Sequence, residues 1–172
     1  MKITTRQLAL CAVLTALALG LSTLENLFPV TLVIPLPGVK LGLANIVTVF
    51  ALYQLGPLPA LCILAARCLL GSLFAGNASA LLFSLLGGTL AMLVMLALSR
   101  LPGLSVYGVS IGGAAAHNCG QVAAAVLSLG NTAPLYYLPV LLGVSLLTGA
   151  FTGLVAACLF RALERTGAVR RG

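Results

Sequence analysis

The polar residues of the stretch AAAHNCGQVAAAV, residues 114–126, are the first candidates for chemistry in this chain. His117 is the only histidine, and Gln121 follows four residues later, so both side chains share one face of a helix. Asn118 is rotated from them by about 100° and is expected at the rim of that face. A single histidine without aspartate or clustered cysteines cannot complete a metal site or a nucleophilic triad. Contact with a ligand and hydrogen bonding between helices both remain open.

Arg67 is the second candidate, because it lies inside an otherwise apolar segment. A charged residue at the centre of a membrane helix costs about 2.5–3.5 kcal/mol on insertion scales, so Arg67 is expected to face the protein interior and to have a partner. One interpretation is that its guanidinium binds an anion or a polar headgroup. The other is an ion pair with Glu25, which is predicted at a reachable depth. The two interpretations are compatible.

The composition places these residues in an integral membrane protein, with the lipid bilayer as its first partner. The chain has 172 residues, of which 61% are hydrophobic and 6% charged, whereas soluble domains carry about 25% charged residues. Glu25 and Glu164 are its only acids. The five cysteines form no metal-ligand spacing, so no metal or other cofactor is expected. The net charge of +7 comes mainly from chain ends and loops, as membrane topology predicts, and does not indicate nucleic acid.

Six membrane-spanning helices are predicted, and they make residues 1–172 a single all-α transmembrane domain. A span needs about 20 mostly apolar residues, and stretches with proline, glycine or asparagine separate the candidates. The expected spans lie at about residues 7–27, 41–55, 58–75, 78–99, 105–128 and 135–162.

The basic residues predict a multi-pass protein of the cell membrane with both termini in the cytoplasm. Six spans put both chain ends on one side, and the loops on that side hold all but one of the loop and terminal basic residues. Those on the terminal side are Lys2, Arg6, Arg100, Arg161, Arg165, Arg170 and Arg171, and only Lys40 lies on the other side.

Depth along the helices gathers the polar residues in the outer half of the bundle, because each residue advances a helix by about 1.5 Å. This bias predicts an outward-facing pocket. Its candidate residues are Glu25, Lys40, Asn45, Arg67, His117, Asn118, Gln121 and Tyr136. The apolar, proline-containing connection PVTLVIPLPGVKLGLAN is interpreted either as a cover over this pocket or as an interfacial connector.

Small residues recur at four-residue spacing on three predicted helices, which is typical of faces where helices pack closely. The three sets are Gly112, Ala116 and Gly120; Gly87 and Ala91; and Ala12, Ala16 and Gly20. The first two sets are expected to pack inside the bundle. The third set lies on the first helix and is also suited to contact with another subunit.

Five blocks of the sequence resemble the Gx transporter family, whose members are labelled heptaprenyl diphosphate synthase component I. The blocks are LPGVKLGLANIVTVFALYQLG, AARCLLGSLFAG, FSLLGGTLAMLVM, YGVSIGGAAAHNCGQVAAA and YYLPVLLGVSLLTGAFTGLVA, and the resemblance covers roughly residues 5–163. That family is similar to the substrate-binding (S) components of energy-coupling factor transporters. The resemblance implies a six-helix protein that captures a small molecule and joins a coupling subunit and two ATPase subunits.

The resemblance further implies that Ala12 and Ala16 contact the coupling subunit and that the connection at about residues 29–40 gates the ligand. The 172 residues contain no GxxxxGK[ST] nucleotide motif, which agrees with ATP hydrolysis in partner subunits. The alternative is a membrane subunit of a prenyl diphosphate synthase. It would be non-catalytic, because binding Mg²⁺ and diphosphate normally requires aspartates and the chain has none.

Overall fold

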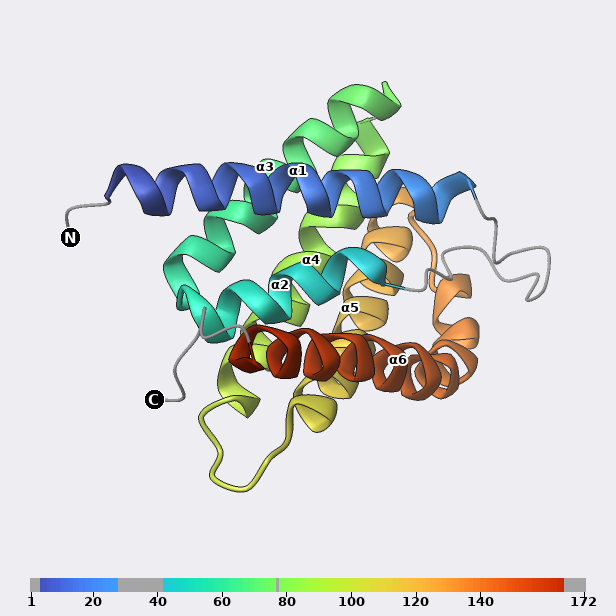
Figure 1. The fold of residues 1–172 in the computed structure, drawn as a ribbon. Coiled ribbons are helices and arrows are strands. Elements are labelled where there is room, and N and C mark those ends of the chain that lie inside the picture. Colours follow the sequence, from blue (N-terminus) through green and yellow to red (C-terminus); the bar gives the residue numbers. More distant parts are fainter. Residues whose placement is uncertain (1–3, 28–41, 77, 166–172) are drawn as a thin grey trace.

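The computed structural model describes residues 4–27, 42–76 and 78–165, which form a bundle of helices (Figure 1). The predicted all-α fold with six α-helices is confirmed. The elements are α1 (Thr5–Leu27), α2 (Leu43–Gln54), α3 (Pro57–Ala75), α4 (Ala78–Leu98), α5 (Val106–Leu129), η2 (Ala133–Tyr137) and α6 (Leu138–Arg165). Lys40 and the connection at 29–40 lie outside the described residues, so their predicted roles stay predictions.

Glycine, proline and serine set the ends of several helices. Pro57 lies in the first turn of α3, where its missing N–H has no intrahelical partner to lose. Gly76 and Gly130 adopt left-handed conformations just after α3 and α5, as helix-ending glycines commonly do. Ser105 caps α5, since its side chain accepts a hydrogen bond from the Gly108 N–H at 3.4 Å. The segment predicted at 135–162 begins instead with the short 3₁₀ helix η2.

Four helical segments in the described part of the chain are long and apolar enough to cross a membrane: Thr5–Glu25, Pro57–Ala75, Ala78–Leu98 and Ala133–Arg165. The α2 helix is also apolar but shorter. The α5 helix, which carries His117, Asn118 and Gln121, is not among the four. The chain is therefore a multi-pass membrane protein by the character of its helices, while the number of six spans stays a prediction.

The helices alternate in direction through the bundle. Along α5 and α6, the neighbouring pairs Asn118–Leu141 and Ile111–Gly149 run in opposite directions, so the two helices are antiparallel. Phe160 near the end of α6 stacks on Phe50 of α2, with ring centroids 5.7 Å apart. The start of α1, the end of α6 and the α4–α5 connection all lie on the left side of Figure 1.

This arrangement brings the described terminal-side arginines, Arg6, Arg100, Arg161 and Arg165, to segments at one end of the bundle. A common end for these arginines is what the predicted orientation requires. The orientation itself, with both termini in the cytoplasm, stays a prediction.

Backbone-to-backbone contacts join α4, α5 and α6. A Cβ atom on Gly120 would lie 2.6 Å from the Leu86 carbonyl oxygen and 2.7 Å from the Gly87 Cα. A Cβ atom on Gly149 of α6 would lie 2.5 Å from the Ile111 Cα of α5. The expectation that the glycines of the fourth and fifth helices mark close-packing faces is therefore confirmed.

The third small-residue set behaves differently, because it does not pack within the described structure. Ala12, Ala16 and Gly20 are all exposed on α1, and a Cβ atom on Gly20 would meet nothing within 4 Å. The α1 helix instead uses Leu14 and Ala18 to pack into the core.

We predict that Gly120→Ala lowers the stability of the protein by about 1–3 kcal/mol, as overpacking of a tight contact does. The added methyl group would meet backbone atoms of α4, which cannot rotate away. Gly143→Ala on α6 is the matched control, because nothing lies within 4 Å of its Cβ position. Thermal unfolding of both variants in detergent measures the difference, and equal unfolding midpoints would show that the α4–α5 contact is not tight.

Candidate ligand-binding cavity

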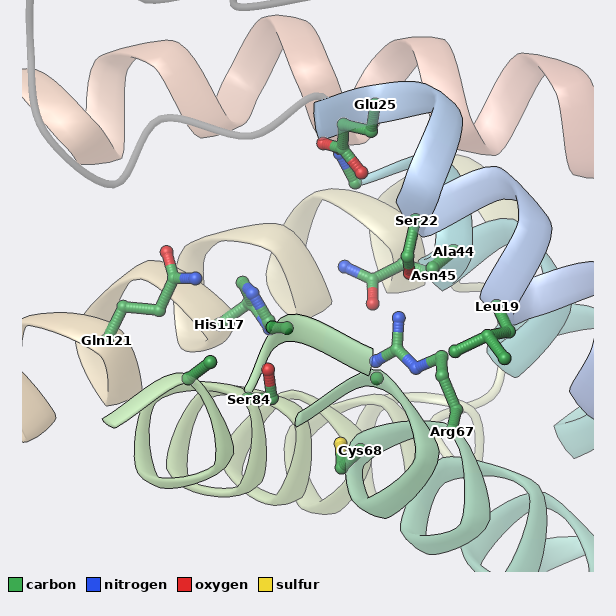
Figure 2. A pocket seen from close by; sticks show the side chains of 14 residues that line it. Leu19, Ser22, Glu25, Ala44, Asn45, Arg67, Cys68, Ser84, His117 and Gln121 are labelled. Atoms are coloured by element: carbon green, nitrogen blue, oxygen red, sulfur yellow. The ribbon is translucent and has the colours of Figure 1, made fainter. Parts of the chain in front are cut away.

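A polar cavity of about 110 Å³ lies among α1, α2, α3, α4 and α5 (Figure 2). A cavity needs about 10–15 Å³ to hold one water, so this cavity has room for several waters or a small polar group. Of the eight predicted pocket residues, five line this cavity: Glu25, Asn45, Arg67, His117 and Gln121. Polar residues predicted on four different helices therefore do come together.

The carboxylate of Glu25 is held at the start of α2. Its Oε1 accepts a hydrogen bond from the Gly42 N–H at 2.6 Å, and the Glu25 side chain is buried. Gly42 has a φ of 75°, a left-handed conformation that glycine adopts without strain. The N-terminal end of a helix carries partial positive charge, so it stabilises the carboxylate there. The Glu25 charge is therefore already partly compensated by backbone.

The guanidinium of Arg67 lies deeper in the cavity. Arg67 is 9% exposed, and its Nε atom is buried without a hydrogen-bond partner in the described part of the chain. Figure 2 shows the guanidinium pointing from α3 toward Asn45, while Glu25 lies at the far end of the same space. Glu25 acts on Arg67 electrostatically. Cys68, the next residue on α3, adds a side-chain hydrogen bond to Arg67.

Asn45 and Gln121 add two buried amides to the same space. Both residues line the cavity. Buried polar groups in proteins are nearly always hydrogen-bonded to protein, water or ligand. Asn45 from α2 and Gln121 from α5 therefore add two polar side chains to the lining of the cavity that Arg67 also lines.

His117 lines the polar cavity and also a smaller neighbouring one of about 10 Å³. Its ring packs against α4, since a Cβ atom on Gly87 would lie 3.0 Å from the His117 Cε1. Among the residues that the structure describes, no three histidine, cysteine or acidic side chains come together as metal ligands would. The side chains that surround the cavity supply hydrogen bonds and one cation, which suit binding.

Asn118 and Tyr136 are not brought to the polar cavity. Asn118 faces α6, where its Nδ2 donates a hydrogen bond to the Leu141 carbonyl oxygen at 3.0 Å, and it lines only the smaller cavity. This follows from its rotation of about 100° from His117 on the helix. Tyr136 lies on η2 and is 85% exposed, outside both cavities.

Three further side chains with an oxygen or sulfur atom line the cavity without having been predicted: Ser22, Cys68 and Ser84. Ser22 lies three residues before Glu25, so a shared helix face was a usable signal. Cys68 follows Arg67 directly, and adjacent residues on a helix do not normally share a face. Ser84 had no distinguishing neighbour, because the α4 sequence is apolar on all sides.

These features define a multi-pass α-helical membrane protein with a buried polar cavity between its helices. The family described as "Heptaprenyl diphosphate synthase component I" matches residues 14–159, and the chain belongs to this family. Comparison with curated proteins found no match, and comparison with solved structures found none either. The family resemblance noted in the sequence is thereby confirmed, while the likeness to substrate-binding components stays a prediction.

We predict that Asn118→Ala lowers stability by about 1 kcal/mol, the usual net contribution of one hydrogen bond. Its amide joins α5 to the Leu141 carbonyl and does not border the polar cavity, so ligand binding should be unchanged. Thr132→Ala, in the exposed connection before η2, is the control, because the Thr132 side chain makes no capping hydrogen bond there. Thermal unfolding measured with and without bound ligand separates an effect on stability from an effect on ligand binding. A loss of ligand binding without a loss of stability would instead assign Asn118 to the polar cavity.

Proposed function

We propose that this protein is a membrane-embedded, non-catalytic subunit that binds a small anionic or amphipathic solute in the Arg67 cavity. The observation that supports the proposal is that three buried polar residues, Arg67, Asn45 and Gln121, line one cavity. A ligand anion would accept hydrogen bonds from all three.

The charge distribution supports an anion in particular. The nearest acid in the cavity, Glu25, already accepts the Gly42 N–H at the start of α2. A buried cation with incomplete compensation is costly in a membrane protein. An anion beside the guanidinium would offset that cost and make a charge-assisted hydrogen bond.

In the proposed assembly, the protein is the capture subunit of an importer of the energy-coupling factor type. The 172 residues contain no nucleotide-binding motif, so ATP hydrolysis is assigned to two partner ATPases acting through a coupling subunit. The exposed face of α1 with Ala12 and Ala16 is the proposed contact for that subunit. Small residues there would allow a partner helix to approach closely.

The family description favours a second function, a membrane subunit associated with a prenyl diphosphate synthase. In this function the Arg67 cavity would hold the anionic end of a substrate or product, and catalysis would belong to a partner. The chain contains no aspartate with which to hold the Mg²⁺ that such catalysis normally uses.

We predict that Arg67→Gln removes a ligand that the wild-type protein carries from its native membrane. Loss of a charged hydrogen-bonding partner costs about 1.5–3 kcal/mol, so occupancy should fall about tenfold or more. Arg161→Gln, exposed near the end of α6, is the control. The proteins are purified into nanodiscs, extracted with solvent and analysed by mass spectrometry for small anions, with thermal unfolding run in parallel.

An anion that is present in wild type and Arg161→Gln but depleted in Arg67→Gln supports the binding function. Equal amounts in all three proteins, with Arg67→Gln still folded, contradict it. Affinity capture of the tagged full chain from native membranes then separates the two assemblies. An ATPase pair among the captured proteins supports the importer, and a soluble prenyl diphosphate synthase subunit supports the second function.

A further inference from the structure

The smaller cavity beside the polar one lies where α2, α5 and α6 meet. Its volume is about 10 Å³, which is close to the space that one water molecule requires. Its lining consists of Gly42 and Asn45 at the start of α2, Ala114, His117 and Asn118 of α5, and Thr148 and Thr152 of α6. Polar side chains predominate in this lining, whereas cavities that stay dry are lined by apolar ones.

The groups around the smaller cavity include both donors and acceptors of hydrogen bonds. Asn118 donates from its Nδ2 to the Leu141 carbonyl oxygen at 3.0 Å, and its Oδ1 is the acceptor of the same amide. The Thr152 hydroxyl donates to the Gly149 carbonyl oxygen at 3.0 Å, so toward the cavity this hydroxyl can only accept. The Thr148 hydroxyl can donate as well as accept. A water molecule, which also does both, matches this mixed set of groups.

These groups are also removed from bulk solvent. Asn118 and Thr148 are each 7% exposed, and Thr152 is 2% exposed. Buried polar groups are nearly always hydrogen-bonded to protein or to ordered water. A bridging water is almost as favourable in enthalpy as a direct hydrogen bond, so one water here would link polar groups of different helices.

We infer that the smaller cavity is a binding site for one structural water that joins α2, α5 and α6. Asn45, Asn118 and Thr148 would contact this water, one from each helix. Asn45 and His117 line the polar cavity as well, so the water would support one wall of that cavity. The inference concerns water alone and does not depend on the proposed binding function.

Water suits this cavity better than a sodium ion does. Among the described residues that line the cavity, none is acidic. A sodium ion would therefore bring an uncompensated charge into the interior of the bundle, and burying an unpaired charge costs far more than burying a hydrogen-bonded neutral group.

The test compares two substitutions at Ala114, which lines the smaller cavity from α5. Serine and cysteine have nearly the same shape, but a hydroxyl forms strong hydrogen bonds and a thiol forms weak ones. Ala114→Ser and Ala114→Cys thus both place an atom in the volume assigned to the water, and only serine replaces the hydrogen bonds of the water. Thermal unfolding of the full chain in nanodiscs compares the two variants.

We expect Ala114→Ser to unfold about 2–4 °C above Ala114→Cys, the shift that one hydrogen bond produces in a chain of this length. An apolar atom that fills a dry cavity gains contacts without losing a hydrogen bond. An equal or higher unfolding midpoint for Ala114→Cys would therefore show that the cavity is dry and overturn the inference.

Thr148→Val provides a second measurement, because valine keeps the branched shape of threonine and removes the hydroxyl. We expect its unfolding midpoint to fall by about 2–4 °C. Thr48→Val is the matched control, since Thr48 is also buried, donates to the Ala44 carbonyl oxygen of its own helix and lines neither cavity. It should match wild type. The inference is overturned if Thr148→Val matches wild type as well.

Wild type and Ala114→Ser are finally unfolded in sodium chloride and in choline chloride at the same ionic strength. Equal midpoints in the two salts are the result expected for a water site. A higher midpoint of the wild type in sodium chloride, lost in Ala114→Ser, would assign the cavity to the cation and overturn the inference.

Discussion

The backbone contact between Gly87 of α4 and Gly120 of α5 is the constraint on which the rest of the structure depends. With no side chain on either residue, the two helices meet directly, and a Cβ on Gly120 would lie 2.6 Å from the Leu86 carbonyl oxygen. His117 and Gln121 flank this contact on α5 and are thereby fixed at the edge of the polar cavity. An apolar groove lined by Phe83 of α4 and Val122 of α5 borders the same pair of helices. A wider spacing of α4 and α5 would move the walls of both hollows at once.

The electrostatics of the cavity follow from where the two charged side chains sit. Glu25 lies at the start of α2, where the Gly42 N–H and the helix dipole both stabilise a carboxylate. Arg67 comes from the middle of α3, where Cys68 adds a side-chain hydrogen bond and the buried Nε has no partner among the described residues. In the cavity, the Glu25 carboxylate therefore accepts a hydrogen bond from backbone, whereas the Arg67 Nε has no hydrogen-bond partner among the described residues.

Much of the fold could be predicted from the sequence because its signals are local. Apolar runs separated by residues such as Pro57, Gly76 and Gly130 mark the six α-helices, and glycines at regular spacing mark the α4–α5 contact. Depth along each helix also gathered Arg67 and Gln121 in one cavity. These predictions need only the helix rise and the habits of proline and glycine.

The remainder depends on how helices rotate and tilt against one another, which an apolar sequence does not determine. Helix α4 is apolar all round, so nothing in its sequence indicates that Ser84 faces the cavity while Phe83 faces the groove. Asn118 lies beside His117 in sequence but donates its hydrogen bond to α6. Tyr136 was predicted to line the pocket only from its depth along the last predicted helix. It lies instead on the 3₁₀ helix η2, where it is exposed at the surface.

The polarity of α5 has a consequence for how the protein is made. Four helical segments in the described part of the chain are apolar and long enough to cross a membrane. The helices α4 and α6 belong to these four segments, but α5, which lies between them in the sequence, does not. Its glycines and its polar face are covered only when α4 and α6 lie against it. A nascent α5 would therefore gain little from entering lipid alone, and its retention should depend on the arrival of α6. Membrane integration of the second half of the chain is in this sense a cooperative step, in which α5 is held in the membrane by α4 and α6.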